Sequence, residues 1–208
     1  MKNVNIILII IFITNIFSTC EKVVREPDKY SFKMASSILP DNDSIHVGDT
    51  ITLEIHGLIK QIDSNSRQVI NFDKANNLST SVYFDKLAFD STTLGSLTFS
   101  TNAFATIVEN GKAAMSSFPE RIKQFGFEEN NGEYLLKLKI IPLDTGLFSI
   151  TLQDLPLIYR NSDRNTKATY FVTIANTEQH LYYMENYLPD LIIDDNLSRH
   201  LYCFKVYK

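Results

Sequence analysis

The chain has 208 residues, of which 44% are hydrophobic and 21% are charged, and its formal net charge is −4. An apolar content this high predicts a globular protein and excludes a largely disordered one. The mildly acidic balance, without a basic tract, argues against nucleic acid as a partner. After the first twenty residues no apolar run is long enough to span a membrane, so we expect the rest of the chain to form a soluble domain.

The N-terminal segment has the plan of an export signal. Lys2 supplies a positive charge, an apolar run follows from Val4 to Phe17, and small residues precede Cys20. The run is shorter than the ~20 residues of a comfortable membrane span. Ser18-Thr19-Cys20 resembles the lipobox of bacterial lipoproteins, in the loose form found in Bacteroidota. The resemblance implies cleavage before Cys20, a lipid on this cysteine, and a location at the outer membrane, facing either the periplasm or the outside.

The two cysteines, Cys20 and Cys203, bear on the same question. If Cys20 carries lipid, Cys203 has no intrachain partner, and we expect it to be a small buried hydrophobic residue. A Cys20–Cys203 disulfide is the alternative in an oxidising compartment. Ordinary cleavage that leaves a free Cys20, an uncleaved anchor and a cytosolic protein are the other interpretations of the N-terminus. His200 lies three residues before Cys203 on an expected strand, so the two face opposite sides and are not expected to form a catalytic pair.

These features divide the chain into a signal peptide (residues 1–19), a lipidated polar tether (20–29) and one domain (30–208). The tether contains Pro27 and spans at most ~30 Å when extended. The character of the sequence changes at about residue 176, where a C-terminal extension with a helix and a strand begins. The sequence contains no internal repeat.

Strand patterns dominate the domain. Ile51, Leu53 and Ile55 alternate with polar residues, which predicts a half-buried strand. The segment Val47–Leu53, VGDTITL, is similar to the second strand of immunoglobulin-like modules in bacterial envelope proteins. A short strand is expected at Val69-Ile70 inside an otherwise polar loop. Further strands are expected at residues 31–38, 81–89, 97–99, 134–141, 147–152, 168–174 and 201–207.

Two turns shape the expected topology. Asn110-Gly111 is a strong hairpin signal and predicts that residues 103–108 pair with residues 112–115. The segment from Asp144 to Phe148 resembles the corner of an immunoglobulin-like sandwich, where an aromatic residue anchors the turn. Phe148 takes the place of the usual tyrosine and has no hydroxyl group, so the resemblance extends to the shape of the turn only.

A short helix is expected between two of the strands. Ser117-Phe118-Pro119-Glu120 has the spacing of a capping box with proline in the first turn. Ile122 and Phe125 follow three residues apart, and Gly126 comes next. This pattern predicts a two-turn helix.

A second helix is expected in the C-terminal extension. The segment from Asn176 to Gln179 can cap it, and Pro189 ends it. Its apolar positions are three and four residues apart: Leu181, Met184 and Leu188. Together the patterns predict a mainly β protein, an immunoglobulin-like antiparallel β-sandwich with short helical insertions and a C-terminal helix-plus-strand extension.

Motifs that carry chemistry are scarce. The four histidines lack the spacing of a zinc protease, and no cysteine pair accompanies them. Asp41-Asn42-Asp43-Ser44 opens like a calcium loop but lacks that motif's glycine and glutamate, so we interpret it as a polar turn. The adjacent acids Glu128-Glu129 and Asp194-Asp195 are expected at the surface, although a fold can bring distant carboxylates together, as in glycosidases. No cofactor or metal is expected.

Tyrosines crowd the last third of the chain. Tyr182, Tyr183 and Tyr187 are candidate ligand-binding residues, because exposed tyrosines stack on sugars and anchor protein partners. Coverage of the sheet edges is the other interpretation. We therefore expect a non-catalytic envelope lipoprotein that acts as a binding or assembly module for an envelope protein. A glycan-binding module of a nutrient-uptake system is the alternative, and a hydrolase is favoured by none of these residues.

Overall fold

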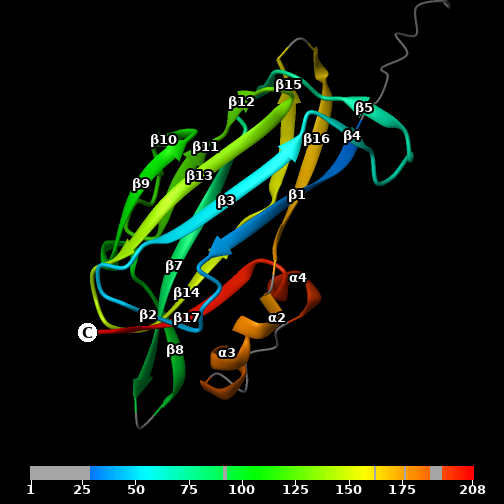
Figure 1. The fold of residues 1–208 in the computed structure, drawn as a ribbon. Coiled ribbons are helices and arrows are strands. Elements are labelled where there is room, and N and C mark those ends of the chain that lie inside the picture. Colours follow the sequence, from blue (N-terminus) through cyan, green and yellow to red (C-terminus); the bar gives the residue numbers. More distant parts are fainter. Residues whose placement is uncertain (1–28, 91–92, 162, 176, 188–193) are drawn as a thin grey trace, which may run out of the picture.

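Two β-sheets packed face to face make up most of the molecule (Figure 1). This arrangement confirms the expected mainly β, immunoglobulin-like sandwich with short helical elements. The computed structural model describes residues 29–90, 93–161, 163–175, 177–187 and 194–208. The signal peptide, Cys20 and residues 20–28 of the tether lie outside the described residues.

The first sheet, sheet A, has eight strands and lies in front in Figure 1. The path runs β12-β13-β3-β1-β16-β15-β6, and β9 also pairs with β13. All pairs are antiparallel except β1 with β16. The strands are β1 (Lys29–Leu39), β3 (Ile51–Leu58), β6 (Ala75–Asn76), β9 (Phe104–Asn110), β12 (Glu128–Asn130), β13 (Glu133–Pro142), β15 (Leu155–Arg160) and β16 (Asp163–Ile174).

The second sheet, sheet B, has seven strands in the order β10-β11-β7-β14-β17-β2, with β8 also paired to β7. Only β17 and β2 are parallel. A small separate sheet joins β4 (Lys60–Ile62) to β5 (Val69–Asn71). The strands of sheet B are β2 (Ser44–His46), β7 (Ser79–Asp90), β8 (Thr93–Phe99), β10 (Lys112–Ala114), β11 (Ile122–Gly126), β14 (Gly146–Leu152) and β17 (Leu201–Tyr207).

Alternating hydrophobicity explains why these segments are strands. In β3 and β13 every second residue is buried, and these residues point into the core between the sheets. Aromatic rings fill the centre of that core. The Phe104 ring stacks on Phe84 at 4.8 Å and meets Phe148 edge-on at 4.9 Å. Phe148, the expected anchor of the corner, is fully buried there.

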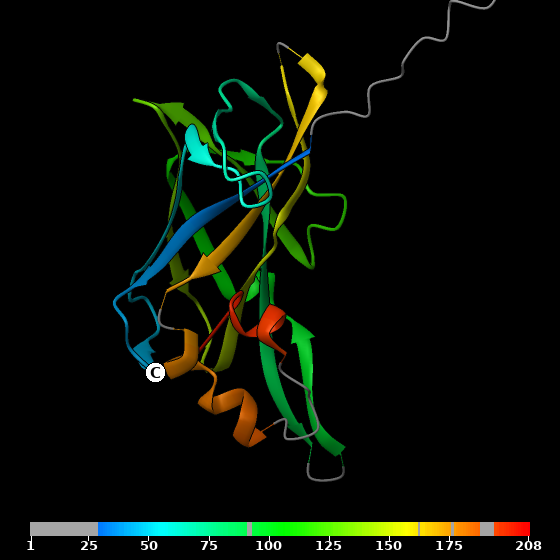
Figure 2. The ribbon, with the colours of Figure 1, turned by 90° about the vertical axis from the view of Figure 1, so that its right-hand side faces the viewer.

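β17 is buried on both faces, which alternation alone does not produce. Tyr202, Phe204 and Val206 point into the main core. Leu201 and Cys203 point outward into a second cluster, where α2 and α3 pack against the strand. In Figure 2 these helices (orange) lie toward the lower end of the sandwich.

The expected C-terminal helix is present in two pieces, α2 (Thr177–His180) and α3 (Tyr182–Tyr187). Leu181 lies between them, and both Leu181 and Met184 are buried as expected. The expected helix end at Leu188-Pro189 lies outside the described residues. A further short helix, α4 (Asp195–Ser198), was not expected; the Asp194 carboxylate accepts a hydrogen bond from the Leu197 amide and caps it. The adjacent acids Asp194 and Asp195 are exposed, as expected, and lie at the start of this helix.

The prediction of a helix between Ser117 and Gly126 is wrong. A turn is followed at Ile122 by the strand β11, which pairs with β7 along its whole length. Lys123 and Phe125 face the interior, because they lie opposite Val82 and Thr80 of β7. The three-residue spacing of Ile122 and Phe125 therefore does not indicate a helix, since the two side chains point to opposite faces of a strand.

The prediction of a hairpin at Asn110-Gly111 is also wrong. β9 pairs with β13 in sheet A, whereas β10 pairs with β11 in sheet B. Gly111 carries the chain from one sheet to the other with φ +96°. A Cβ atom at this position would lie 2.5 Å from the Gly126 carbonyl oxygen and 2.9 Å from Leu136 Cδ1. Only glycine accommodates both the backbone angle and the contact.

We expect Gly111→Ala to destabilise the fold by about 2 kcal/mol or more, because positive φ and a backbone clash act together. Gly132→Ala is the matched control: Gly132 has φ +83°, but no atom lies within 4 Å of the place that a Cβ would occupy, so only the conformational cost of about 1 kcal/mol applies. Urea unfolding of the two variants measures the difference. Equal losses in both would show that the Gly111–Gly126 contact is unimportant.

Candidate functional site

One side of the sandwich is left open where Gly111 carries the chain from sheet A to sheet B. We define the open side as the region where β9 and β12 end sheet A and β10 ends sheet B. Two hollows adjoin the β10–β11 pair there, and Ala114 lines both of them. Lys112 lies opposite Gly126 and belongs to the first hollow, whereas Ala113 lies opposite Phe125 and belongs to the second.

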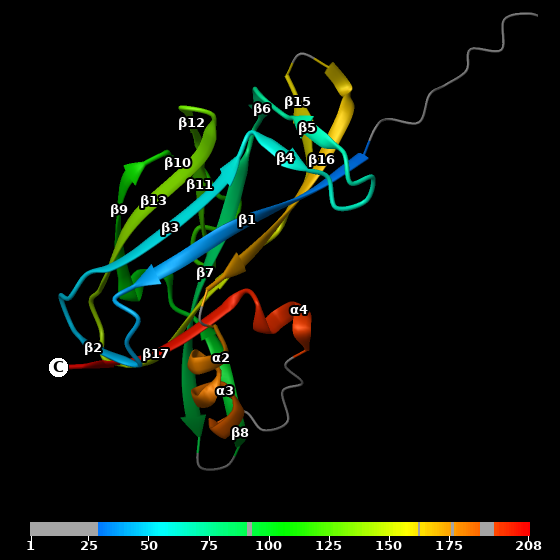
Figure 3. The same ribbon diagram turned by 45° about the vertical axis from the view of Figure 1, so that its right-hand side comes forward.

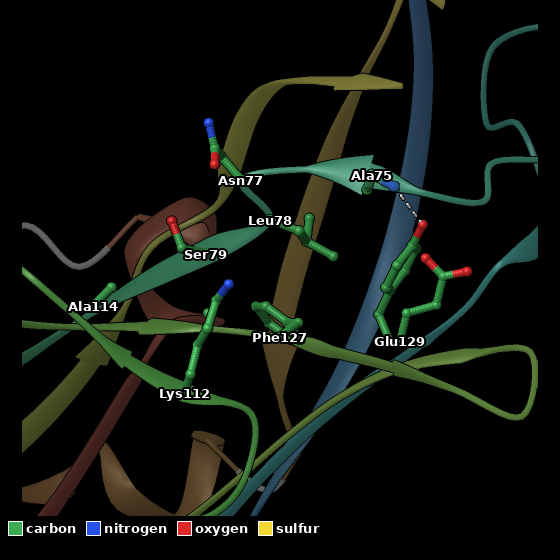
Figure 4. Close-up of a pocket in the computed structure, with 10 residues that line it drawn as sticks. Ala75, Asn77, Leu78, Ser79, Lys112, Ala114, Phe127 and Glu129 are labelled. Carbon is green, nitrogen blue, oxygen red and sulfur yellow. Dashed lines mark hydrogen bonds between the residues drawn. The ribbon is translucent and has the colours of Figure 1, made fainter. Parts of the chain in front are cut away.

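The first hollow, the polar pocket, has a volume of about 280 Å³. Figure 4 shows Lys112 and Glu129 on different sides of a floor made by Leu78 and Phe127. The pocket draws its lining from β6, the β6–β7 turn, and strands β7, β10, β11, β12 and β13. The lining residues are Ala75, Asn77, Leu78, Ser79, Lys112, Ala114, Gly126, Phe127, Glu129 and Tyr134.

Local packing positions the charged groups of the polar pocket. Gly126 makes room for the Lys112 stem, since a Cβ there would come within 2.9 Å of Lys112 Cε. Glu129 Oε2 accepts the Lys74 amide hydrogen at 2.9 Å, which fixes the carboxylate at the pocket wall. Lys112 makes no ion pair with any described residue. The pocket therefore offers an ammonium group and a carboxylate to a ligand.

Tyr134 is a structural member of the lining. Its hydroxyl donates to the Phe72 carbonyl at 2.7 Å and accepts from the Ala75 amide at 2.9 Å. Burial raises the pKa of this phenol well above its ordinary value, so the group stays protonated. It holds β6 against β13 and leaves ligand contacts to the other polar groups.

The second hollow, the apolar groove, has a volume of about 470 Å³ and lies between β9 and the β10–β11 pair. Among the described residues that line it, Lys123 is the one that carries a charge. The lining residues are Thr106, Ala113, Ala114, Met115, Ser116, Pro119, Ile122, Lys123, Gln124 and Phe125.

The residues predicted to bind ligand lie elsewhere. Tyr182, Tyr183 and Tyr187 belong to α3, at the end of the sandwich away from β6 and β12, as Figure 3 shows. Their side chains are outside the described part of the structure, and so is Cys20. The fold therefore does not bring the three tyrosines to the polar pocket. Of the pocket's polar groups, only Glu129 belonged to a pair considered in the sequence, and it was expected to be an ordinary surface acid.

The expected polar turn at Asp41–Ser44 has a structural task. Asp41 Oδ1 lies 2.7 Å from His180 Nε2, and the Cys203 carbonyl oxygen lies 3.0 Å from His180 Nδ1. The imidazole is buried and stacks on Tyr202 at 3.8 Å. These contacts fasten α2 to β17 and to the β1–β2 turn. Neither calcium nor zinc chemistry is needed to explain them.

A row of three polar side chains lies under the C-terminal helices. Asp85, Ser149 and Cys203 are direct neighbours on β7, β14 and β17, so they share the outer face of sheet B. The thiol has no disulfide partner among the described residues and is fully buried, and burial, with a smaller effect from Asp85, raises its pKa to about 12. The Ser149 hydroxyl has no hydrogen-bond partner among the described residues. Such a thiol is a poor nucleophile, which agrees with the buried role expected for Cys203.

Two other kinds of feature are absent from the described residues. No group of three or more His, Cys, Asp and Glu side chains there is arranged to hold a metal ion. None of the helices in the described ranges has the length and apolar character needed to cross a membrane.

No protein-family model and no curated protein sequence matches the chain. Among solved structures, the C. elegans Cep-1 DNA-binding domain is 9% identical, covers 76% of this chain and 98% of its own, and has a TM-score of 0.35. The human F-spondin reeler domain is 10% identical over 74% of this chain and 91% of its own, with a TM-score of 0.32. A type II cohesin dyad from the ScaA scaffoldin of Acetivibrio cellulolyticus is 11% identical over 69% and 46%, with a TM-score of 0.27. No functional inference follows from likenesses this distant.

The Asp85 carboxyl should make stability depend on pH. Burial raises its pKa from 3.8 to about 6, so the folded state binds this proton more tightly than the unfolded state does. Stability is therefore lost as pH rises from about 4 to 6 and stays lower above that. A shift of this size corresponds to about 3 kcal/mol, and solvent screening of a half-buried carboxyl reduces it to about 1 to 2 kcal/mol.

Asp85→Asn should consequently be more stable than the wild type at pH 8 and equal to it near pH 3.5, as measured by urea unfolding. Asp144→Asn is the opposing control, because Asp144 pairs with Lys86 at 2.6 Å and its pKa is lowered. That variant should lose stability at pH 8. An Asp85 effect that does not change with pH would contradict the assignment.

Proposed function

We propose that the protein is a cell-envelope lipoprotein, anchored through Cys20, whose sandwich acts as a non-catalytic binding or assembly module. The N-terminal pattern supports the anchor, and the polar pocket supports the binding role. The pocket carries the proposal because it combines an ammonium group that no described acid pairs with, a fixed carboxylate and an apolar floor within one hollow. Pockets of this composition orient a ligand through a few polar groups while the floor excludes water.

The chemistry of the pocket favours the end of a glycan as its ligand. Sugar hydroxyls both donate and accept hydrogen bonds, and Lys112, Asn77, Ser79 and Glu129 offer both kinds of partner. The apolar face of a sugar ring can lie against Leu78 and Phe127. Glu129 is the one carboxylate among the described lining residues, whereas glycosidases use a pair. A glycan-binding module of a nutrient-uptake system is thus the more specific form of the proposal.

The anchor is tested by mass spectrometry of the protein purified from the membranes of its native host. We expect a mature N-terminus at Cys20 that carries acyl chains. An unmodified Cys20, or a chain that retains Met1, would refute the lipoprotein assignment without affecting the binding role.

The binding role is tested on a glycan array with the domain beginning at Cys20. We expect binding that weakens about tenfold or more in Lys112→Met/Glu129→Gln, since each change removes a hydrogen bond to a charged group. Tyr182→Ala/Tyr183→Ala is the comparison, and it should bind as the wild type does.

Two results would revise this proposal. Loss of binding in the tyrosine variant alone would move the glycan site to α3. Absence of any bound glycan would leave the assembly role, which is then tested by whether the native protein co-purifies with other envelope proteins in a complex that Lys112→Met/Glu129→Gln disrupts.

A further inference from the structure

The apolar groove has a lining unlike that of the polar pocket. Ala113 and Phe125, which are paired across β10 and β11, contribute apolar walls. Met115 stands at the groove with 94% of its surface exposed. A methionine in this position is costly to leave in water, and its flexible thioether adapts readily to an apolar ligand. The groove is therefore suited to an apolar chain.

Lys123 places a positive charge inside this groove. Its side chain is half-buried, and its Nζ lies 5.5 Å from the centre of the Phe84 ring. The ammonium donates one hydrogen bond, to the Phe104 carbonyl oxygen at 2.6 Å. No acidic side chain among the described residues forms an ion pair with it.

This arrangement leaves the ammonium incompletely satisfied. A lysine has three donors, and only one of them has a partner in the described structure. Burial lowers the pKa of Lys123, which reflects the cost of holding the charge away from water without a counter-charge. An anionic group that entered the groove would supply both the charge and the missing acceptors.

We propose that the apolar groove binds a free fatty acid of medium chain length, with its carboxylate on Lys123 and its alkyl chain along Ala113, Phe125 and Met115. The requirement for one negative charge follows from the single lysine. The requirement for an apolar tail follows from the walls. The groove and the polar pocket share Ala114 in their linings, but Lys112 and Glu129 do not line the groove, so this site does not depend on the pocket being a glycan site.

The test uses decanoate and its uncharged analogue decanol, each below its aggregation threshold, with the domain beginning at Cys20. Isothermal titration should give saturable decanoate binding to the wild type. Lys123→Met keeps the apolar volume and removes the charge, so decanoate should bind about tenfold or more weakly, the cost of losing a charged hydrogen bond. Decanol binding should change by less than about twofold.

Lys33→Met is the matched control, because Lys33 is an exposed lysine on the outer face of β1; it should bind decanoate as the wild type does. Amide NMR spectra of the wild type locate the site without any substitution. Decanoate should shift the signals of Ala113, Met115 and Phe125 and leave those of Asn77 and Ser79 in place. Unchanged groove signals, or equal decanoate affinity in the wild type and Lys123→Met, would overturn the proposal.

Discussion

The close contact between Gly111 and the Gly126 carbonyl sets the geometry on which both hollows depend. The chain leaves sheet A at Asn110 and enters sheet B at Lys112, with one residue between them. Because Gly111 has no Cβ, the end of β11 can lie directly against the crossover and hold β10 in sheet B. A β9–β10 hairpin would have kept both strands in one sheet. The side of the sandwich between β9 and β10 stays open because the chain crosses instead.

On the outer face of sheet B, under the C-terminal helices, the burial of apolar side chains is set against the cost of buried polar groups. Five hydrophobic side chains and Cys203 form the second cluster there, and each large apolar side chain contributes about 1.5 to 3 kcal/mol when fully buried. Against this stand the Ser149 hydroxyl, at about 1 to 3 kcal/mol for an unpaired buried group, and the charge on Asp85. The apolar term is several times larger. The helices therefore stay in place over an imperfect polar row.

Local strand patterns made most of the strands predictable, and long-range pairing made the rest unpredictable. β3 and β13 follow from every-second-residue patterns, and β17 follows from its aromatic residues. The Ser117–Gly126 segment misled because its capping spacing is local, whereas its pairing with β7 reaches back some forty residues. Asn110-Gly111 marked a real turn, but a local signal does not say which sheet the next strand joins.

The site was hidden from the sequence for a related reason. Lys112, Lys123 and Glu129 look like ordinary surface charges in a chain where about a fifth of the residues are charged. Only the register of β10, β11 and β12 places them at the two hollows, and no motif in the sequence encodes that register. By contrast, the fold class needed only the number and spacing of the strands.

The start of β1 connects the proposed anchor to the site. β1, which starts at Lys29, begins at the end of the sandwich that also carries β6 and β12 (Figures 1 and 3). It follows Cys20 by nine residues, and a chain of that length reaches at most ~30 Å. A lipid on Cys20 would therefore hold this end, with the polar pocket, close to the membrane surface, and would direct α2 and α3 away from it. With such an anchor, ligands of the pocket would have to approach between the domain and the membrane, which would favour the free ends of flexible chains over bulky folded partners.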